Sequence, residues 1–303
     1  MTGRGLGSSG GDASRPPDHP RPRMSPADHA ELALTLEVAS TPKPGNVDRR
    51  RDHDDLRFEH FLAGAVGARP GLELAGTVGD DPPALGDAFE RAVRGMSQQS
   101  GGNTQFGCLL LLVPLVRAAT TDRLSTDGLR TITDTTTVDD AAAFYRAFEH
   151  VDVAVDDPPA DAPDLDVRRG ADAVPTLRDR GLTLADVMAL SADRDGNAAE
   201  WADGFERVFA AADRVLADEG PVTDRLAHAF LDLLAERPDT LVAVEHGRER
   251  ATDVSREAAA ARGDLDAAED LAERFLEEGI NPGTTADLTA AAAFVALEQG
   301  VSL

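Results

Sequence analysis

The stretch GGNTQFGCLLLLVPLVRA, residues 101–118, contains the most apolar part of this 303-residue chain. Its uninterrupted apolar run covers residues 108–116. A helix that crosses a bilayer needs about 20 apolar residues, so this run is too short to span a membrane. Two good helix-capping residues, Asn103 and Thr104, stand just before it. The stretch therefore predicts a buried helix over residues 107–118.

The segments on both sides of this stretch also read as helices. They are rich in Leu, Ala, Glu and Arg and show little alternation of Val, Ile and Thr, which leaves almost no place for a sheet. The predicted helices cover residues 25–40, 58–78, 82–96, 107–118, 126–136, 138–150, 183–191, 197–217, 223–236, 245–262, 265–278 and 284–297. Residues 152–175 are dense in Asp, Pro and Ala and predict a long connection or lid.

The fold class that follows is all-α, a single compact multi-helix domain over residues 25–303. Residues 1–24 have no apolar segment of the kind a signal peptide needs. Their Gly, Ser, Pro and Arg content predicts a disordered tail.

Composition restricts the partners of the protein. It has 55 acidic and 30 basic residues, a net charge of −25, which argues against binding to nucleic acid or to an anionic membrane. A single cysteine, Cys108, excludes an internal disulfide and a cysteine-based zinc site, and fits a reducing cytoplasm. Lys43 is the only lysine among the 30 basic residues. This bias, with the many acids, indicates adaptation to a salty cytoplasm.

The first of four loops with unusual chemistry is TPKPGNVDR, residues 41–49. Two prolines flank Lys43, and Gly45 permits conformations closed to other residues. Lys43 and Arg49 supply positive charge for phosphate oxygens, and Asp48 supplies a carboxylate for Mg²⁺. The alternative is an ordinary turn between two helices.

The second loop is GGNTQFG, residues 101–107, whose glycines precede a helix start that can bind an anion through free N–H groups. The third contains Asp239 and Thr240. The fourth is NPGTTAD, residues 281–287, with a carboxylate in the first helical turn. Plain capped helix starts remain the alternative for these loops.

His53, Asp54 and Asp55 follow the first loop closely. They are candidates for a general base or for metal ligands. Solvated side chains in a polar loop are the alternative.

Taken together, these loops resemble those of the triphosphoribosyl-dephospho-CoA synthase family. Residues 41–49 resemble its Pro-Lys-Pro-Gly-x-Val-Asp-Arg signature, and His53 with Asp55 is similar to the His-x-Asp that follows. Residues 101–107 resemble its Gly-x-Asn-Thr-x-x-Gly motif, and residues 281–288 its Pro-Gly-x-x-Ala-Asp-Leu motif. The resemblance covers about residues 28–297, and Asp239-Thr240 stands where the family has an Asp-Thr pair.

The resemblance implies an ATP-dependent transferase. Family members join the triphosphoribosyl group of ATP to the ribose of 3′-dephospho-CoA and release adenine, which implies ATP and dephospho-CoA as substrates and Mg²⁺ with the ATP. On this basis we predict catalytic residues, nucleotide-binding residues and metal ligands. The catalytic set is Asp48, His53, Asp55 and Asp287. The nucleotide-binding set is Lys43, Gly45, Arg49, Gly102, Asn103, Thr104, Gly283 and Thr284. The metal ligands are Asp48 and Asp287.

One departure from the family pattern leaves alternatives open. Where bacterial members commonly carry His-Lys, this chain has Gln105 and Phe106, so a cation that could meet a triphosphate is absent. Either Arg49 or another arginine replaces it, or the substrate differs. The alternatives are a nucleotide-dependent transferase acting on a different cofactor precursor and a non-catalytic nucleotide-binding helical protein. The sequence leaves the oligomeric state and the acyl carrier partner open.

Overall fold

The computed structural model describes residues 1, 24–53, 56–158 and 162–303, and in these residues it confirms the all-α prediction. The β-structure in these residues consists of two isolated antiparallel bridges, Asp48 with Arg51 and His53 with Leu56. The α-helices are α1 Pro26–Ala39, α2 Phe58–Ala75, α3 Leu85–Met96, α4 Phe106–Thr120, α5 Thr126–Asp134, α6 Val138–Ala147, α7 Val174–Arg180, α8 Leu184–Ser191, α9 Gly196–Asp203, α10 Glu206–Ala217, α11 Val222–Glu236, α12 Thr240–His246, α13 Arg248–Ala260, α14 Leu265–Glu277 and α15 Gly283–Glu298. Two 3₁₀ helices, η1 Pro163–Leu165 and η2 Val167–Ala173, precede α7.

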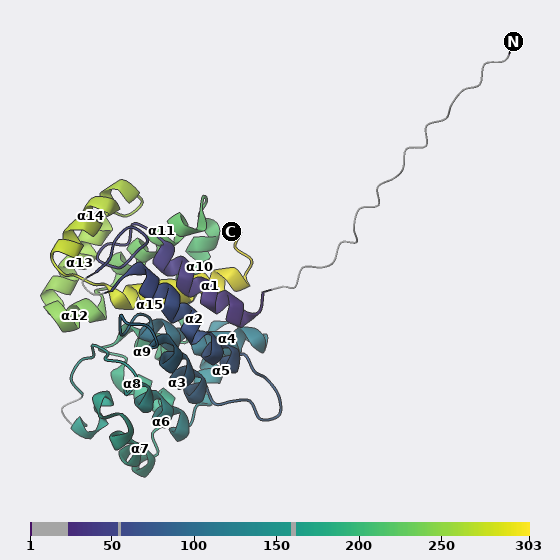
Figure 1. Ribbon diagram of the computed structural model, residues 1–303. Helices are drawn as coiled ribbons and strands as arrows, with labels where there is room; N and C mark the ends of the chain where they lie inside the picture. The colour runs from purple at the N-terminus through teal and green to yellow at the C-terminus, as the bar shows by residue number, and fades with distance from the viewer. Residues whose placement is uncertain (2–23, 54–55, 159–161) are drawn as a thin grey trace.

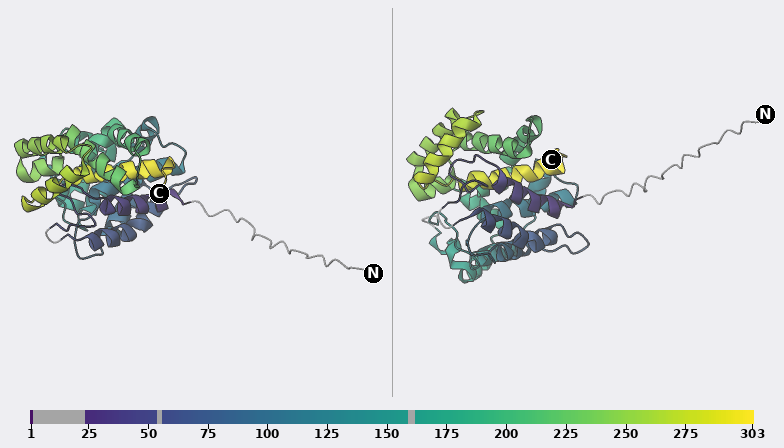
Figure 2. Two further views of the ribbon diagram at one scale, coloured as in Figure 1. Left: turned by 90° about the horizontal axis from the view of Figure 1, so that it is seen from above. Right: turned by 45° about the horizontal axis from the view of Figure 1, so that its top comes forward.

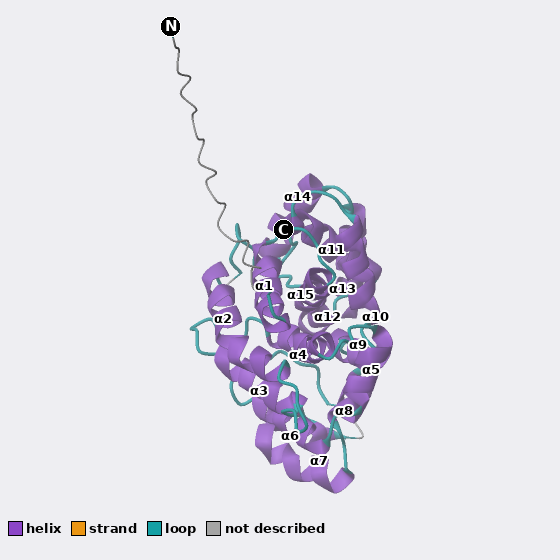
Figure 3. Cartoon of the chain, turned by 90° about the vertical axis from the view of Figure 1, so that its right-hand side faces the viewer, coloured by secondary structure: helices purple, strands orange, loops and turns teal. Residues whose placement is uncertain are grey.

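The C-terminal helix α15 runs through the middle of the molecule and packs against α1, α4, α10 and α11 (Figure 1). On one side α2 packs on α3 and α3 on α6, with α7 and α8 beyond them. On the opposite side α11, α13 and α14 enclose a second apolar cluster that contains Phe230 and Phe275. The two further views show the same central position of α15 (Figure 2), and the chain consists of helices joined by loops (Figure 3).

Helix α4 is the predicted buried helix, and its side chains from Cys108 to Val116 are all buried. Pro114 lies inside it and has no N–H to give to the carbonyl of Leu110, four residues earlier. The indole Nε1 of Trp201 donates a 3.1 Å hydrogen bond to that carbonyl instead. The proline is therefore tolerated because a side chain from α9 satisfies the acceptor that it leaves free.

The helix predicted over residues 197–217 is two helices, α9 and α10. Gly204 and Phe205 between them have φ values of 72° and 66°, in the left-handed region that stops a helix. Phe205 is fully buried, and the carboxylate of Glu200 accepts a hydrogen bond from the amide of Val208 in the first turn of α10. Tertiary packing of the phenyl ring thus fixes a break that helix propensity alone does not predict.

The prediction was also wrong at two other places. Residues 245–262 were expected to form one helix, but the chain forms α12 and α13, divided at Gly247 with φ 86°. Residues 152–175, predicted to be a long connection or lid, also contain η1, η2 and the start of α7, which the sequence analysis did not predict. Short helical turns of three to seven residues carry too few positions to show a periodic pattern.

None of the helices in the described ranges has the length and hydropathy of a bilayer-crossing segment. The predicted disordered tail lies outside the described residues, apart from Met1 and Met24.

Candidate active site

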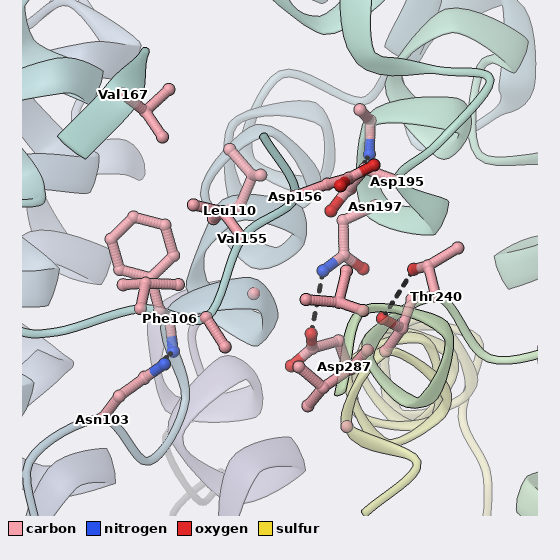
Figure 4. Close-up of a pocket in the computed structure, with 18 of the residues that line it drawn as sticks. Asn103, Phe106, Leu110, Val155, Asp156, Val167, Asp195, Asn197, Thr240 and Asp287 are labelled. Carbon is pink, nitrogen blue, oxygen red and sulfur yellow. Dashed lines mark hydrogen bonds between the residues drawn. The ribbon is translucent and has the colours of Figure 1, made fainter. Parts of the chain in front are cut away.

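A pocket of about 250 Å³ lies where four helices begin: α4, α9, α12 and α15. The connection over residues 153–158 covers one side of it, and α1 contributes Glu37. Figure 4 shows Asn103, Asn197, Thr240 and Asp287 approaching the space from these different elements. The four loops singled out in the sequence therefore come together around the start of α15.

Asp287, in the first turns of α15, is the polar centre of this pocket. Its Oδ2 accepts a 2.8 Å hydrogen bond from the side-chain amide of Asn197, drawn in Figure 4, and its Oδ1 accepts a 3.1 Å bond from the thiol of Cys108. A Cβ atom on Gly107 would overlap the Asp287 carboxylate, so α4 approaches α15 this closely only because residue 107 is glycine. The other amide atom of Asn197, the buried Oδ1, has no hydrogen-bond partner among the described residues.

Burial, together with the negative charges of Asp239 and Glu37, raises the pKa of Asp287 to about 7. The hydrogen bonds from Asn197 and Cys108 act in the opposite direction. Burial also raises the pKa of the Cys108 thiol well above its ordinary value. The thiol therefore stays protonated and donates a hydrogen bond to Asp287. Near neutral pH the carboxyl of Asp287 can therefore both accept and release a proton.

Glu37 is a second carboxylate of the pocket, and Lys43 lies directly behind it. The Lys43 ammonium is completely buried, donates to Oε1 of Glu37 and lies 6.0 Å from the centre of the Phe230 ring. Burial raises the pKa of Glu37, and the charge of Lys43 opposes that effect. Lys43 does not line the pocket, so the structure places it behind Glu37 rather than at a phosphate-facing surface.

The remainder of the first loop forms a compact turn beneath the pocket. Asp48 is fully buried; its Oδ1 accepts hydrogen bonds from the amides of Arg50 and Arg51, and its Oδ2 accepts one from the Arg51 guanidinium at 3.2 Å. Gly45 has φ 80°, and a Cβ atom there would overlap the carbonyl of Ile280. The first loop is thus locked against the fourth by backbone contact.

The third and fourth loops are joined through Asp239. Its Oδ2 accepts hydrogen bonds from the amide and hydroxyl of Thr285, each 2.7 Å long, while its Oδ1 caps the start of α12. Thr240 and Thr284 share a 2.9 Å hydrogen bond at the pocket wall (Figure 4). Thr284 and Gly283, both predicted to bind the nucleotide, line the pocket.

The second loop supplies both polar and apolar lining. The Asn103 side chain accepts a 3.1 Å bond from the amide of Phe106 and caps α4, and Thr104 lines the pocket beside it. Gly102 is exposed outside the lining. Phe106 lies 4.7 Å, centre to centre, from Phe148, and the two rings form an apolar wall of the cavity.

Two further predicted site residues, Arg49 and His53, lie outside the pocket lining. Arg49 is exposed and does not line the pocket. His53 is buried outside the lining, and its backbone pairs with that of Leu56. Asp55 lies outside the described residues.

Sequence reasoning missed Glu37, Asn197 and Arg194, which all line the pocket. Glu37 lies within α1, where a polar residue carries no local sign of function, whereas Asn197 belongs to the run RDGN at the start of α9. A signal did exist for Arg194, because the run RDGN at residues 194–197 interrupts the helical pattern and Asp195 caps α9.

The predicted metal ligands do not meet in the pocket. Asp48 is committed to the hydrogen bonds of its own turn and does not line the cavity, whereas Asp287 does. In the described part of the chain, no group of three or more His, Cys, Asp and Glu side chains is arranged to hold a metal ion. Mg²⁺ in nucleotide sites commonly needs only one or two carboxylates besides phosphate oxygens and water.

Comparison with known proteins points to one family. The sequence model of the family described as ATP:dephospho-CoA triphosphoribosyl transferase matches residues 23–302. A crystal structure of a protein from Archaeoglobus fulgidus, assigned as a triphosphoribosyl-dephospho-CoA synthase, is similar to this chain with a TM-score of 0.66 and 28% identity; the match covers 81% of this chain and 100% of that one. No curated protein sequence matches the chain.

Proposed function

Because the chain belongs to the ATP:dephospho-CoA triphosphoribosyl transferase family, we propose that it transfers the triphosphoribosyl group of ATP to 3′-dephospho-CoA and releases adenine. One observation carries the proposal: Asp287, whose pKa is raised to about 7, lies in a pocket that has an apolar wall of Phe106 and Phe148. A displacement at the anomeric carbon needs a group that accepts a proton from the attacking hydroxyl. It also needs negative charge close to the oxocarbenium-like centre.

The bond changes assign a role to each part of the pocket. The bond between the ribose C1′ of ATP and adenine breaks, a bond between C1′ and a ribose hydroxyl oxygen of the acceptor forms, and the hydroxyl proton goes in balance to the departing adenine. Asp287 accepts that proton from the attacking hydroxyl. Asn197 orients the carboxylate of Asp287 through its side-chain amide.

Glu37 and the aromatic wall have different roles: Glu37 acts on the reacting ribose, and the aromatic wall holds the adenine. The carboxylate of Glu37, paired with Lys43, contributes negative charge that stabilises the positive charge developing on the ribose. The faces of Phe106 and Phe148 offer an apolar surface for the adenine ring. Mg²⁺ enters as part of the MgATP substrate, where it neutralises phosphate charge, and no step of this scheme passes through it.

The experiment that tests the proposal measures free adenine in KCl-rich buffer with ATP alone, with ATP plus dephospho-CoA, and with no enzyme. We expect adenine release that requires dephospho-CoA and falls at least a hundredfold in Asp287→Asn. The matched control is Asp213→Asn, which changes an exposed acid of α10. Release without an acceptor would indicate a nucleosidase and contradict the proposal, as would full activity in Asp287→Asn.

A further inference from the structure

A second cavity, of about 220 Å³, lies next to the active-site pocket and shares Arg194, Asp195, Thr240 and Thr284 with it. It lies between the start of α9, the first turn of α10 and the turn that joins α11 to α12. Its size admits several water molecules or phosphate groups. Three arginines line it: Arg194, Arg207 and Arg237.

Arg207 is the most unusual of the three. Its Nε atom is buried and has no hydrogen-bond partner among the residues that the structure describes. Burial lowers the pKa of Arg207, and the like charge of Arg237 adds to this effect, whereas the charges of Glu200, Glu236 and Asp239 oppose it. A guanidinium left partly desolvated and unpaired is costly, which is the condition expected of a group that awaits an anion.

The carboxylates around this cavity do not neutralise the arginines directly. Asp239 accepts four hydrogen bonds from the chain, and Asp195 accepts one from the amide of Ala198. Asp193 is exposed. Arg194 donates to the carbonyl of Asp157 and lies 3.9 Å from Asp156. The free hydrogen-bonding capacity of the cavity therefore belongs to guanidinium donors, and these donors match phosphate oxygens.

We propose that this arginine cavity binds a phosphate chain of the substrate while the reacting ribose lies at Asp287. The inference rests on the proposed function, because both substrates of that reaction carry phosphate chains: a triphosphate on ATP and a diphosphate in dephospho-CoA. This chain has Phe106 where bacterial members commonly carry a lysine. The proposal supplies the missing positive charge from Arg207, Arg237 and Arg194 instead. It also assigns a role to the Arg207 guanidinium, whose buried Nε has no hydrogen-bond partner among the described residues.

The first test measures binding of inorganic tripolyphosphate to the full chain by calorimetry at one fixed KCl concentration. Arg207→Gln and Arg237→Gln are each expected to weaken binding roughly tenfold to hundredfold, as loss of a charge-assisted contact does. Arg256→Gln is the matched control, since this arginine is exposed on α13. Equal affinity in all four proteins overturns the proposal.

Arg207→Met separates an anion site from a structural role. If Arg207 awaits an anion, the variant melts at the same or a higher temperature than the wild type without ligand and loses the stabilisation that tripolyphosphate gives. A variant that melts lower and still gains the full stabilisation overturns the proposal.

Steady-state kinetics then identify the source of the phosphate chain. A rise in KM for ATP alone assigns the cavity to the triphosphate, and a rise in KM for dephospho-CoA alone assigns it to the diphosphate. Active enzyme whose arginine variants keep both KM values and their tripolyphosphate affinity refutes this inference and leaves the proposed function standing. Binding of tripolyphosphate that depends on Arg207, in a protein that releases no adenine, supports the cavity and refutes the proposed function instead.

Discussion

Asp287 concentrates the chemistry of the site in one side chain, and its titration links activity to stability. Because the folded-state pKa of about 7 lies above the ordinary value of 3.8, the folded protein binds more protons than the unfolded chain between those pH values. This carboxyl therefore makes stability fall as pH rises from about 4 to about 7. The Asp287→Asn variant lacks this effect. Its free energy of unfolding is expected to fall less steeply with pH than that of the wild type, and the two slopes are expected to differ by up to about 1.4 kcal/mol per pH unit.

Denaturant unfolding of the two proteins at pH 4, 5.5 and 7 checks this expectation at constant KCl. Other acids with raised pKa values, such as Glu200 at about 7, are present in both proteins and cancel in the comparison. Parallel curves for the two proteins would show that Asp287 titrates normally.

Lys43 was predicted to contact phosphate, and its burial in the structure changes what its substitution should do. Since its ammonium is buried against Glu37, Lys43→Ala leaves an unpaired carboxylate in the core and is expected to cost roughly 3–5 kcal/mol of stability. The double variant Glu37→Leu/Lys43→Met, which removes both charges, is expected to recover most of that loss. Urea unfolding measures both. A single variant as stable as the wild type would mean that the ion pair contributes nothing to the fold.

At the residue scale, the sequence analysis named Asp287, Thr284 and Asn103, which line the active-site pocket, but not the lining residues Glu37, Asn197 and Arg207. The first three stand in loops where Pro, Gly or a cap breaks the helical pattern, so they are visible locally. Glu37 lies inside α1, and Asn197 and Arg207 are the second residues of α9 and α10; packing brings the three side chains to the pockets. The uniqueness of Lys43 was visible in the sequence, yet its burial behind Glu37 depends on the tertiary fold.

At the element scale, the contact of α4 with α15 sets the position of Asp287. Gly107→Ala is expected to displace the carboxylate or the Asn197 amide and to lower the turnover number at least tenfold, with a smaller effect on stability. The comparison variant is Gly76→Ala at the end of α2, where the new methyl group meets only ordinary contacts and φ is −78°. Unchanged turnover in Gly107→Ala would show that the close approach of the two helices is not needed for catalysis.

The helices themselves were largely predictable, because strong helix formers fill them and some begin at clear caps such as Ser25-Pro26. The errors are specific. Gly204 and Gly247 stop helices that the surrounding Ala, Glu and Arg would continue, and the positive φ at each is imposed by tertiary packing and capping rather than by local preference.

At the scale of the whole molecule, the net charge of −25 governs stability. Many surface arginines pair with acids, as Arg69 does with Asp28, Glu31 and Glu73, yet the 25 excess negative charges repel one another. Because the Debye length shrinks from about 30 Å at 0.01 M salt to about 3 Å at 1 M, the melting temperature is expected to rise with KCl. Differential scanning calorimetry across that range checks the expectation. A melting temperature independent of salt would mean that the acids are compensated locally.

The central claim is that the triphosphoribosyl group of ATP is transferred to dephospho-CoA in the pocket built around Asp287. The measurement that tests it most directly is mass spectrometry of the acceptor after incubation with ATP carrying ¹³C in its ribose. The account predicts dephospho-CoA enlarged by one labelled triphosphoribosyl group in the wild type and in Asp213→Asn, and at least a hundredfold less of it in Asp287→Asn. Unlabelled dephospho-CoA after the wild-type reaction, or equal labelling with Asp287→Asn, would contradict the account.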